Sequence, residues 1–509
     1  MFRVLLWKEI REHLMTFRFA AALVTTFMLV VISVWVLGED YMRRRDLANT
    51  LSQTSMELAT KVFVPSQIRP VVQRPPSALS IFAMGEDVHL GDAAEIRRWS
   101  VPTSAEDNMT ENKLLASMQP FDLSAIIVVA VSLFGVLLSY DSFSGERERG
   151  TLRLLCAFPQ KRGKIFAVKF LAGSLVLALP LLFSLICALL ILQFVHGIGF
   201  SQEEWPAIAL MFFSSMLYGA FFVAVGLVSS ALVTRSSTSL ALGLLFWTVL
   251  VILLPSAGNG LASSLHPLLN PEEISMFVQE SSHEVRNKVR DFRSKNNLEL
   301  SSYGDNGIEG ESPFYYDGLP LWFRDHMRYI GYHEQLQQQR AEQIWNLDSK
   351  HLARKREQYG LSTAINSVSP AYQFRTVINS LAGTDYTSYA DFMEQCRRYR
   401  RTLMDDFRSK GLFDRHINRF FSRWELSDMQ SDEQVDERNK EILELYLAGK
   451  MLGPEDRWEP LPKDYAPSFS YQGGGPGIKA ALWPLASIVL MTTVVFCIGF
   501  IAFTRYDVR

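Results

Sequence analysis

The chain has 509 residues, of which 48% are hydrophobic and only 20% are charged. A soluble protein of this size carries about 25% charged residues, so the composition argues against a purely soluble chain. The formal net charge is −2, and this overall charge gives no reason to expect a nucleic-acid partner.

Six apolar runs have lengths near the roughly 20 residues that cross a hydrocarbon core of about 30 Å. We predict that they form transmembrane helices at residues 19–37, 121–140, 165–195, 207–233, 236–256 and 480–503. The runs contain no cluster of ionisable residues, and we expect no buried charge within the spans. The predicted fold class is an all-α membrane protein with six transmembrane helices and hydrophilic insertions.

Residues 1–18 are predicted to form an amphipathic helix at the membrane surface. Its apolar face would consist of Leu5, Leu6, Ile10 and Leu14. A cleaved secretory signal is the alternative, because Arg3 and Lys8 precede an apolar run. That run exceeds the core of about 7–15 residues typical of a signal, and residues 35–38 offer no small-residue cleavage site, so we expect a retained first span.

The orientation follows from the short loops, because Lys and Arg concentrate in short cytoplasmic loops. Residues 141–164 and the tail at 504–509 are basic, and Arg235 lies between the fourth and fifth spans. The loop His196–Glu204 has no Lys or Arg. We therefore predict a multi-pass protein of the bacterial cytoplasmic (inner) membrane with both termini in the cytoplasm.

Two hydrophilic insertions, residues 38–120 and 257–479, would then lie outside the cytoplasm. Arg43-Arg44-Arg45 is the one feature against this topology, although the charge bias weakens in loops longer than about 60 residues. The sequence of the first insertion shows too little pattern to predict a fold. The second is predicted to be mainly helical, with helices over Leu321–Glu357, over Pro370–Leu381 between the caps Ser369 and Gly383, over Ser388–Lys410 and over Asp436–Ala448.

The loop at residues 141–164 carries the most specific pattern in the chain. It contains Glu146-Arg147-Glu148, then Gly150-Thr151-Leu152, Pro159 and Lys161-Arg162. This pattern resembles the first cytoplasmic loop of ABC-2-type permeases, the membrane subunits of ATP-driven exporters. The segment from Ser369 to Asp385 resembles a helical insertion in a branch of that family related to copper-enzyme-maturation and gliding-motility permeases.

The resemblance implies a six-helix, type V exporter-like ABC-2 permease. It also implies that the loop is the ATPase-coupling interface, formed by Glu146, Arg147, Glu148, Gly150, Thr151, Leu152, Pro159, Lys161 and Arg162. Residues 141–156 are predicted to extend the second span as a polar helix, in which Gly150 would allow another backbone to approach closely. By resemblance, a second short helix at residues 158–164 would lie in a groove of the ATPase.

The chain itself shows no nucleotide-binding sequence. It has no GxxxxGK[ST] stretch, and the glycine-rich segment Gly473–Lys479 has the wrong spacing. We therefore expect no cofactor on this chain, with ATP bound by a separate ABC ATPase subunit. A six-span permease is normally half of the membrane unit, so the other expected partners are a second permease copy or a paralogous permease, and membrane lipids.

Other classes of function stay open. A membrane-bound enzyme would need His, Asp or Glu near the membrane surface, but the external histidines lack metal-ligand spacing, so we predict no catalytic and no metal site. The external domain could instead use the ATP cycle for a mechanical or signalling change.

For a transporter, spans without charge favour an amphipathic or lipid-linked cargo over a small ion. On the external domain, Arg397, Arg400 and Arg401 share one helix face and are interpreted as a solvated basic stripe.

Overall fold

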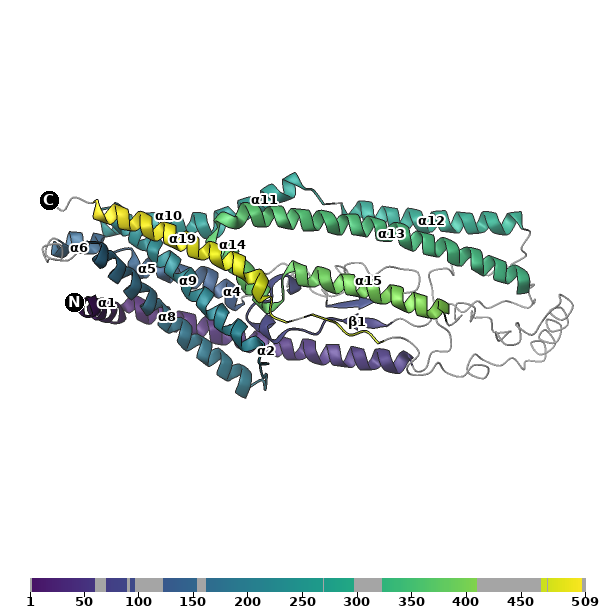
Figure 1. Cartoon of the computed structure of the whole chain (residues 1–509), viewed down its shortest axis with the longest axis horizontal. Coiled ribbons are helices and arrows are strands. Elements are labelled where there is room, and N and C mark those ends of the chain that lie inside the picture. The colour runs from purple at the N-terminus through teal and green to yellow at the C-terminus, as the bar shows by residue number, and fades with distance from the viewer. Residues whose placement is uncertain are drawn as a thin grey trace.

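The computed structural model describes residues 2–59, 70–88, 92–96, 122–152, 162–268, 270–296, 323–409, 468–473 and 475–505. The molecule is elongated and almost entirely helical (Figure 1). Both termini lie at one end, the near end, while long helices project from the opposite, far end. The near end holds α1 (Phe2–Leu14) and α6 (Ser144–Glu148), and the projecting helices are α12 (Pro271–Lys295), α13 (Phe323–Ile365) and α15 (Tyr386–Ser409).

Six helices in the described ranges are long and apolar enough to cross a membrane, which confirms the predicted fold class. They are α2 (Phe17–Ala59), the segment α4–η4–α5–α6 (Leu123–Ile126, Ile127–Val131, Ser132–Ser139, Ser144–Glu148), α8 (Arg162–Phe194), α9 (Glu204–Leu232), the segment α10–η5–α11 (Ser236–Thr248, Val249–Leu253, Leu254–Leu265) and α19 (Ile478–Thr504). Both η4 and η5 are π-helical turns. Two helices run well past the predicted ends of their spans. α2 continues past residue 37, because no proline interrupts its polar extension, and α11 continues past residue 256 to Leu265.

α9 is the centre of the span bundle. It packs against α5, α8, α10 and α19. Fully buried side chains occur on every side of it, among them Phe222, Val223, Ala224 and Leu227. Gly226 lets α5 approach closely, since a Cβ atom there would lie 2.0 Å from the Ser139 hydroxyl. Residues 221–231 of α9 are buried on all sides, so this stretch has no polar face and connects the packing of the bundle.

The helices of the large insertion form where the sequence predicts them. α13 begins at Phe323, covers the described part of the helix predicted over 321–357 and runs on to Ile365, and α15 coincides closely with the helix predicted over 388–410. Ser369 caps the start of α14 (Pro370–Ala382) by accepting a hydrogen bond from a first-turn amide at 3.3 Å, and Gly383 ends that helix with a φ of +71°. The helix predicted over 436–448 lies outside the described residues.

α14 lies on the span bundle and not in the projecting part. It packs against α9 and α19, and most of its apolar side chains are buried. Phe374 stacks on Tyr218 of α9 with ring centroids 4.7 Å apart. The Ser369 hydroxyl also donates a hydrogen bond to the Leu250 carbonyl of η5 at 3.0 Å. α14 therefore covers the far end of the bundle and is fixed to three spans.

The described part of the first insertion packs beside the extension of α2. It contains β1 (Val71–Gln73), the 3₁₀ turns η2 (Ala78–Ile81) and η3 (Gly85–Val88), and β2 (Ala93–Glu95), which pairs antiparallel with β1. The buried Arg74 donates hydrogen bonds to Asp87 and Asp92 at 2.5 and 2.8 Å. Arg44, from the Arg43–Arg45 cluster, pairs with Asp40 at 2.8 Å and is largely buried. Part of that basic cluster thus belongs to internal packing.

The basic stripe on α15 is not wholly solvated. The Arg397 side chain is 7% exposed, bonds to Asp348 of α13 and lies 4.4 Å above the Trp345 ring. Burial raises the pKa of Asp348, an effect that the Arg397 guanidinium opposes. The interpretation as a solvated stripe is therefore wrong for Arg397, which joins α13 to α15, whereas Arg401 is exposed.

Candidate functional site

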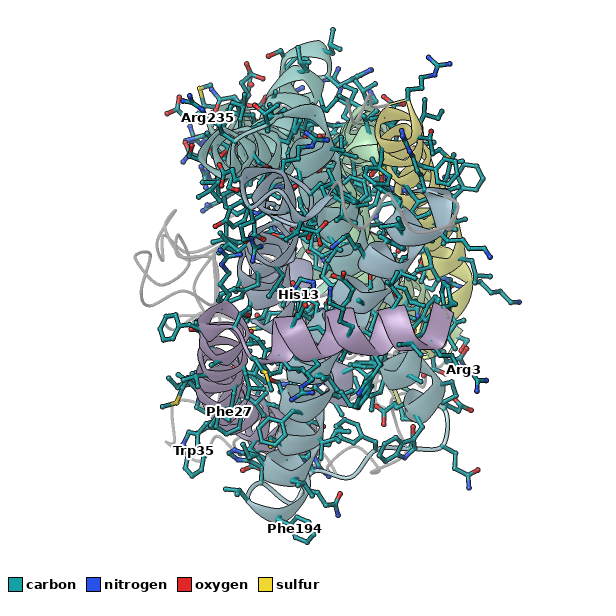
Figure 2. All side chains as sticks on the ribbon, turned by 90° about the vertical axis from the view of Figure 1, so that its left-hand side faces the viewer. Arg3, His13, Phe27, Trp35, Phe194 and Arg235 are labelled. Atoms are coloured by element: carbon teal, nitrogen blue, oxygen red, sulfur yellow. The ribbon has the colours of Figure 1, made fainter. Side chains whose placement is uncertain are left out.

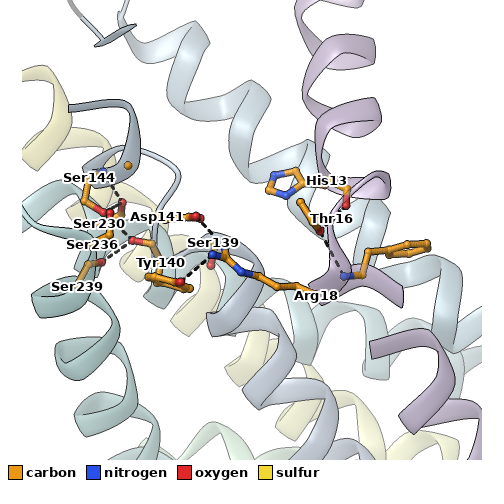
Figure 3. Close-up of polar contacts among 12 residues, drawn as sticks. His13, Thr16, Arg18, Ser139, Tyr140, Asp141, Ser144, Ser230, Ser236 and Ser239 are labelled. Atoms are coloured by element: carbon orange, nitrogen blue, oxygen red, sulfur yellow. Dashed lines mark hydrogen bonds and ion pairs between the residues drawn. The ribbon is translucent and has the colours of Figure 1, made fainter. Parts of the chain in front are cut away.

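The described part of the near-end loop, residues 141–164, begins with a turn that separates α6 from the rest of the second span. α5 ends at Ser139, the chain turns over residues 140–143, and α6 begins at Ser144. The Ser230 hydroxyl of α9 accepts hydrogen bonds from the Phe143 and Ser144 amides, each at 2.9 Å (Figure 3). The polar helix predicted over 141–156 is thus interrupted before Ser144, where another span supplies the partner that a continuing helix would have given to these amides, and residues 153–156 lie outside the described part.

Three consecutive charged residues of α6 reach three different spans. We call Glu146, Arg147 and Glu148 the charged triplet. Glu146 contacts α8, Arg147 contacts the end of α9, and Glu148 contacts the start of α10. Successive side chains of a helix point about 100° apart, so one short helix can face several neighbours. A displacement of α6 therefore acts directly on three spans.

Lys169 is the buried centre of this site. Its ammonium donates to the two Glu9 carboxylate oxygens at 3.0 and 3.1 Å and to Glu146 Oε1 at 2.9 Å. The side chains of Lys169, Glu9 and Glu146 are 2%, 5% and 14% exposed. The expectation of spans without buried charge is thus wrong, and the lysine persists there because two carboxylates surround it. Sequence analysis missed Lys169 and Glu9, although a single lysine within an apolar run is a recognised signal of function.

Arg147 and Glu148 bind the turn between α9 and α10. Arg147 donates to the Val233 and Ala231 carbonyls at 2.6 and 3.0 Å, which the end of α9 leaves without helical partners. Glu148 accepts from the Ser236 amide and hydroxyl, both at 2.9 Å. A cation at the carboxyl end of a helix and an anion at its amino end both interact favourably with the helix dipole. The charges of the triplet thus have the signs that these two helix ends require.

The rest of the predicted interface divides into exposed and buried residues. Glu148, Arg149, Gly150 and Thr151 form an exposed tip, while Leu152 is buried in the core. Gly150 has a φ of +74°, and no atom lies within 4 Å of a Cβ placed on it. The turn therefore requires glycine for its backbone conformation and not, as predicted, for close approach. Arg162 begins α8. The two remaining residues of the predicted interface, Pro159 and Lys161, lie outside the described part.

α1 lies across the near end, over the ends of the spans (Figure 2). It packs on α8, and the most buried residue of α1 is Glu9. Leu14, predicted to lie on its apolar face, is exposed. Burial lowers the pKa of His13, with the Glu9 carboxylate acting in the opposite direction. The α1 helix is therefore attached through its ion pair as well as through apolar contacts.

A second ion pair joins α2 to the turn that precedes α6. Arg18 donates to the Asp141 carboxylate and to the Tyr140 hydroxyl, both at 2.8 Å (Figure 3). Beneath the turn, Phe143 stacks on Phe503 of α19 with centroids 4.3 Å apart and on Phe166 of α8 at 5.8 Å. Polar and aromatic contacts thus connect the near-end loop to all the surrounding spans.

The contacts of this site hold the near-end loop to the spans. Its charges are held in ion pairs or helix-end bonds, and the described residues include no group of three or more His, Cys, Asp or Glu that could hold a metal. The buried Oε2 atom of Glu146 is left without a hydrogen-bond partner. The arrangement can therefore transmit a displacement of the loop to the spans.

The chain is similar to known membrane proteins over its whole length. The family described as ABC-2 family transporter protein matches residues 3–508. A probable ABC transporter permease protein NosY of Stutzerimonas stutzeri is 36% identical over 174 residues, which is 32% of this chain and 63% of that protein. The NosY of Pseudomonas aeruginosa is 35% identical over 177 residues, which is 31% of this chain and 62% of the relative. The matches thus span less than two thirds of these relatives, but the family match covers nearly every residue, and the chain belongs to the ABC-2 family of transporter proteins.

Proposed function

We propose that the chain is the membrane-spanning permease subunit of an ATP-driven exporter whose ATPase is a separate subunit. Such a permease must pass the movement of an ATPase at the membrane surface to its spans. The observation that carries the proposal is the charged triplet, through which the five-residue helix α6 holds α8, α9 and α10. Lys169 extends this connection to α1.

The exposed tip at residues 148–151 is the proposed contact with the ATPase. It is the part of α6 and its following turn that other elements leave uncovered. The residues behind it are buried or bonded to spans, so a force on the tip has stiff neighbours to act on. This placement puts the near end in the cytoplasm, in agreement with the basic short loops.

The cargo is proposed to be amphipathic or lipid-linked, and the assembly to contain two permease chains and two ATPase chains. Lys169 does not argue for an ion pathway, because both of its carboxylate partners lie beside it at the near end. Exposed apolar residues on α10, α11 and α19 offer broad surfaces to membrane lipid and to a second permease copy.

The test is purification of the tagged chain from its own host, with nucleotide hydrolysis as the readout. Arg149→Glu and Thr151→Trp alter the exposed tip without touching a buried contact of the spans. We expect both variants to lose the copurifying ATPase, whereas Arg398→Glu on the exposed face of α15 should keep it. Retention of a stimulated ATPase in both tip variants would contradict the proposal.

The projecting helices favour a second candidate, a mechanical action on a partner outside the membrane. α13 has 43 residues, which at about 1.5 Å per residue is a rod of roughly 65 Å. Its base is tied to span five, since Ser362 and Asn366 donate to Asn259 of α11 at 2.7 and 2.9 Å. A reconstituted complex that hydrolyses ATP but moves no lipid between leaflets would favour this mechanical function over export.

A further inference from the structure

A pocket lies inside the bundle near its far end. Its volume is about 30 Å³. Spans α2, α4, α8 and α9 form its walls, and Phe82 and Ile378 cover it from the side of the first insertion and of α14. Its lining is apolar apart from three serines: Ser124, Ser184 and Ser215. No charged side chain lines the pocket, so an ion would find no charged partner in it, and a sugar would find too few hydrogen-bond partners for its many hydroxyl groups.

Ser184 differs from the other buried hydroxyl groups of the spans. Most of these groups donate to the carbonyl four residues before them, as Ser132, Ser139, Ser214, Ser215, Ser229 and Thr492 do. The Ser184 side chain is 2% exposed, lines the pocket and has no hydrogen-bond partner. Within the pocket, Ser124 donates to Asp122 and Ser215 donates to the Met211 carbonyl. Ser184 therefore offers the one unused donor among the pocket hydroxyls.

The depth of the pocket places it in one leaflet. Ser184 follows Lys169 by 15 positions on the same helix, which is about 22 Å along its axis. If the ion cluster marks one boundary of a hydrocarbon core of about 30 Å, the pocket lies in the opposite leaflet. An apolar wall with a single donor suits a hydrocarbon chain that carries one acceptor, and an acyl ester is such a group in a membrane lipid.

α14 packs on α9 and α19, and polar contacts join the cover to the first insertion, so an outward movement of α14 would break both kinds of contact. The Thr384 hydroxyl, just after α14, donates to the Ala83 carbonyl at 3.0 Å. The Met84 amide donates to Asp122 at 3.1 Å, which joins the first insertion to the start of α4. A pocket of 30 Å³ has room for about two water molecules and none for an acyl chain, so a lipid enters only when α14 moves outward.

We propose that this pocket is the closed form of a chamber for the acyl chain of a membrane lipid, with α14 as its movable cover and the Ser184 hydroxyl as donor to the ester carbonyl. The inference rests on the proposed export of an amphipathic cargo and names its chemical class. It places the chamber within one chain, between α2, α4, α8 and α9.

The experiment uses the full chain in nanodiscs that contain phosphatidylglycerol with a photoreactive diazirine in one acyl chain. The lipid is supplied as the diester and as the matched diether, which lacks the ester carbonyl. Peptide mapping compares labelling of Leu181 and Leu185, which line the pocket, with labelling of Leu182 and Ile186, which are exposed on the same helix. The exposed pair reports lipid around the protein and serves as the internal reference.

We expect pocket labelling by the diester to exceed that by the diether roughly fivefold, as one neutral hydrogen bond allows. Ser184→Ala should lower diester labelling to the diether value. Ser174→Ala is the matched control, because Ser174 on the same helix also has a buried hydroxyl without a partner but does not line the pocket. Ile378→Trp should fill the pocket and remove labelling of Leu181 and Leu185 alone.

Labelling confined to the exposed leucine and isoleucine, or equal labelling by the two lipids, would overturn the proposal and indicate a pocket that holds water. The measurement needs neither nucleotide nor ATPase. Ester-dependent labelling without lipid export would therefore support the proposed chamber and contradict the proposed export. Lipid export without pocket labelling would support export and contradict the chamber.

Discussion

Replacing Lys169 by methionine tests whether the buried ion cluster holds α1 and α6 to the spans. Methionine preserves the length of the side chain and removes its charge. The carboxylates of Glu9 and Glu146 would then remain in a site where their side chains are 5% and 14% exposed. They must either stay charged without the ammonium or take up protons.

Two estimates of the cost agree. Removing one partner of a buried ion pair typically costs about 3–5 kcal/mol. Proton uptake by one of the two glutamates, at the ordinary acidity of that residue, costs about 4 kcal/mol at pH 7 and about 1 kcal/mol at pH 5. We therefore expect Lys169→Met to lower the free energy of unfolding by about 3–5 kcal/mol at pH 7 and by clearly less at pH 5.

The assay is equilibrium or thermal unfolding of the purified chain in detergent at both pH values. Lys164→Met is the matched control, since Lys164 is exposed on the same helix. A triple variant with Glu9→Gln and Glu146→Gln added should recover most of the loss, because no charge is then left buried. If Lys169→Met were no less stable than Lys164→Met, or equally destabilised at pH 5, the cluster would not hold α1 and α6 to the spans as we describe.

Three further predictions concern the far end and the orientation. Arg397→Ser should lower the free energy of unfolding by about 3 kcal/mol through the loss of its buried pair with Asp348, while the exposed Arg398→Ser changes it by less than about 0.5 kcal/mol; equal denaturation midpoints would refute this. Burial raises the pKa of Asp87 to about 6. At pH values between the ordinary pKa of an aspartate and this raised pKa, the folded chain therefore binds more protons than the unfolded chain. Stability should therefore rise by about 1 kcal/mol from pH 7 to pH 5, a gain that Asp87→Asn lacks in paired melting curves. In a background without the four native cysteines, an impermeant thiol reagent added to intact cells should label a cysteine at Ser294 and not one at Thr151, and the opposite pattern would reverse the topology.

The spans and the caps of α14 could be predicted because their signals are local. An apolar run of sufficient length has few alternatives to a membrane helix. Ser369 before Pro370 and Gly383 after the last apolar turn define both ends of one helix by backbone chemistry that neighbouring residues cannot easily override. α2 shows the converse, since its polar extension beyond residue 37 gives no hydropathy signal and yet continues as helix.

The candidate site was only half predictable, because its contacts join distant parts of the sequence. Glu9 lies 160 positions from Lys169, and Glu146 lies 23 positions from it. The pattern of the charged triplet singled out this loop, but it could not tell which of the charges face the neighbouring spans. The turn before α6 depends on Ser230, some 86 positions from Ser144, and no local pattern announces such a partner.

α9 connects the near-end loop to the cover at the far end. Close to its carboxyl end, Ser230 and the Ala231 carbonyl are bonded to the turn before α6 and to Arg147. Tyr218 lies 12 positions earlier, about 18 Å along the helix, and stacks on Phe374 of α14. A well-packed helix shifts as one body, because an interior at crystal-like density yields little along its length. A displacement of α6 therefore has a continuous packed route to α14, and this route joins the proposed ATPase contact to the cover of the proposed lipid chamber.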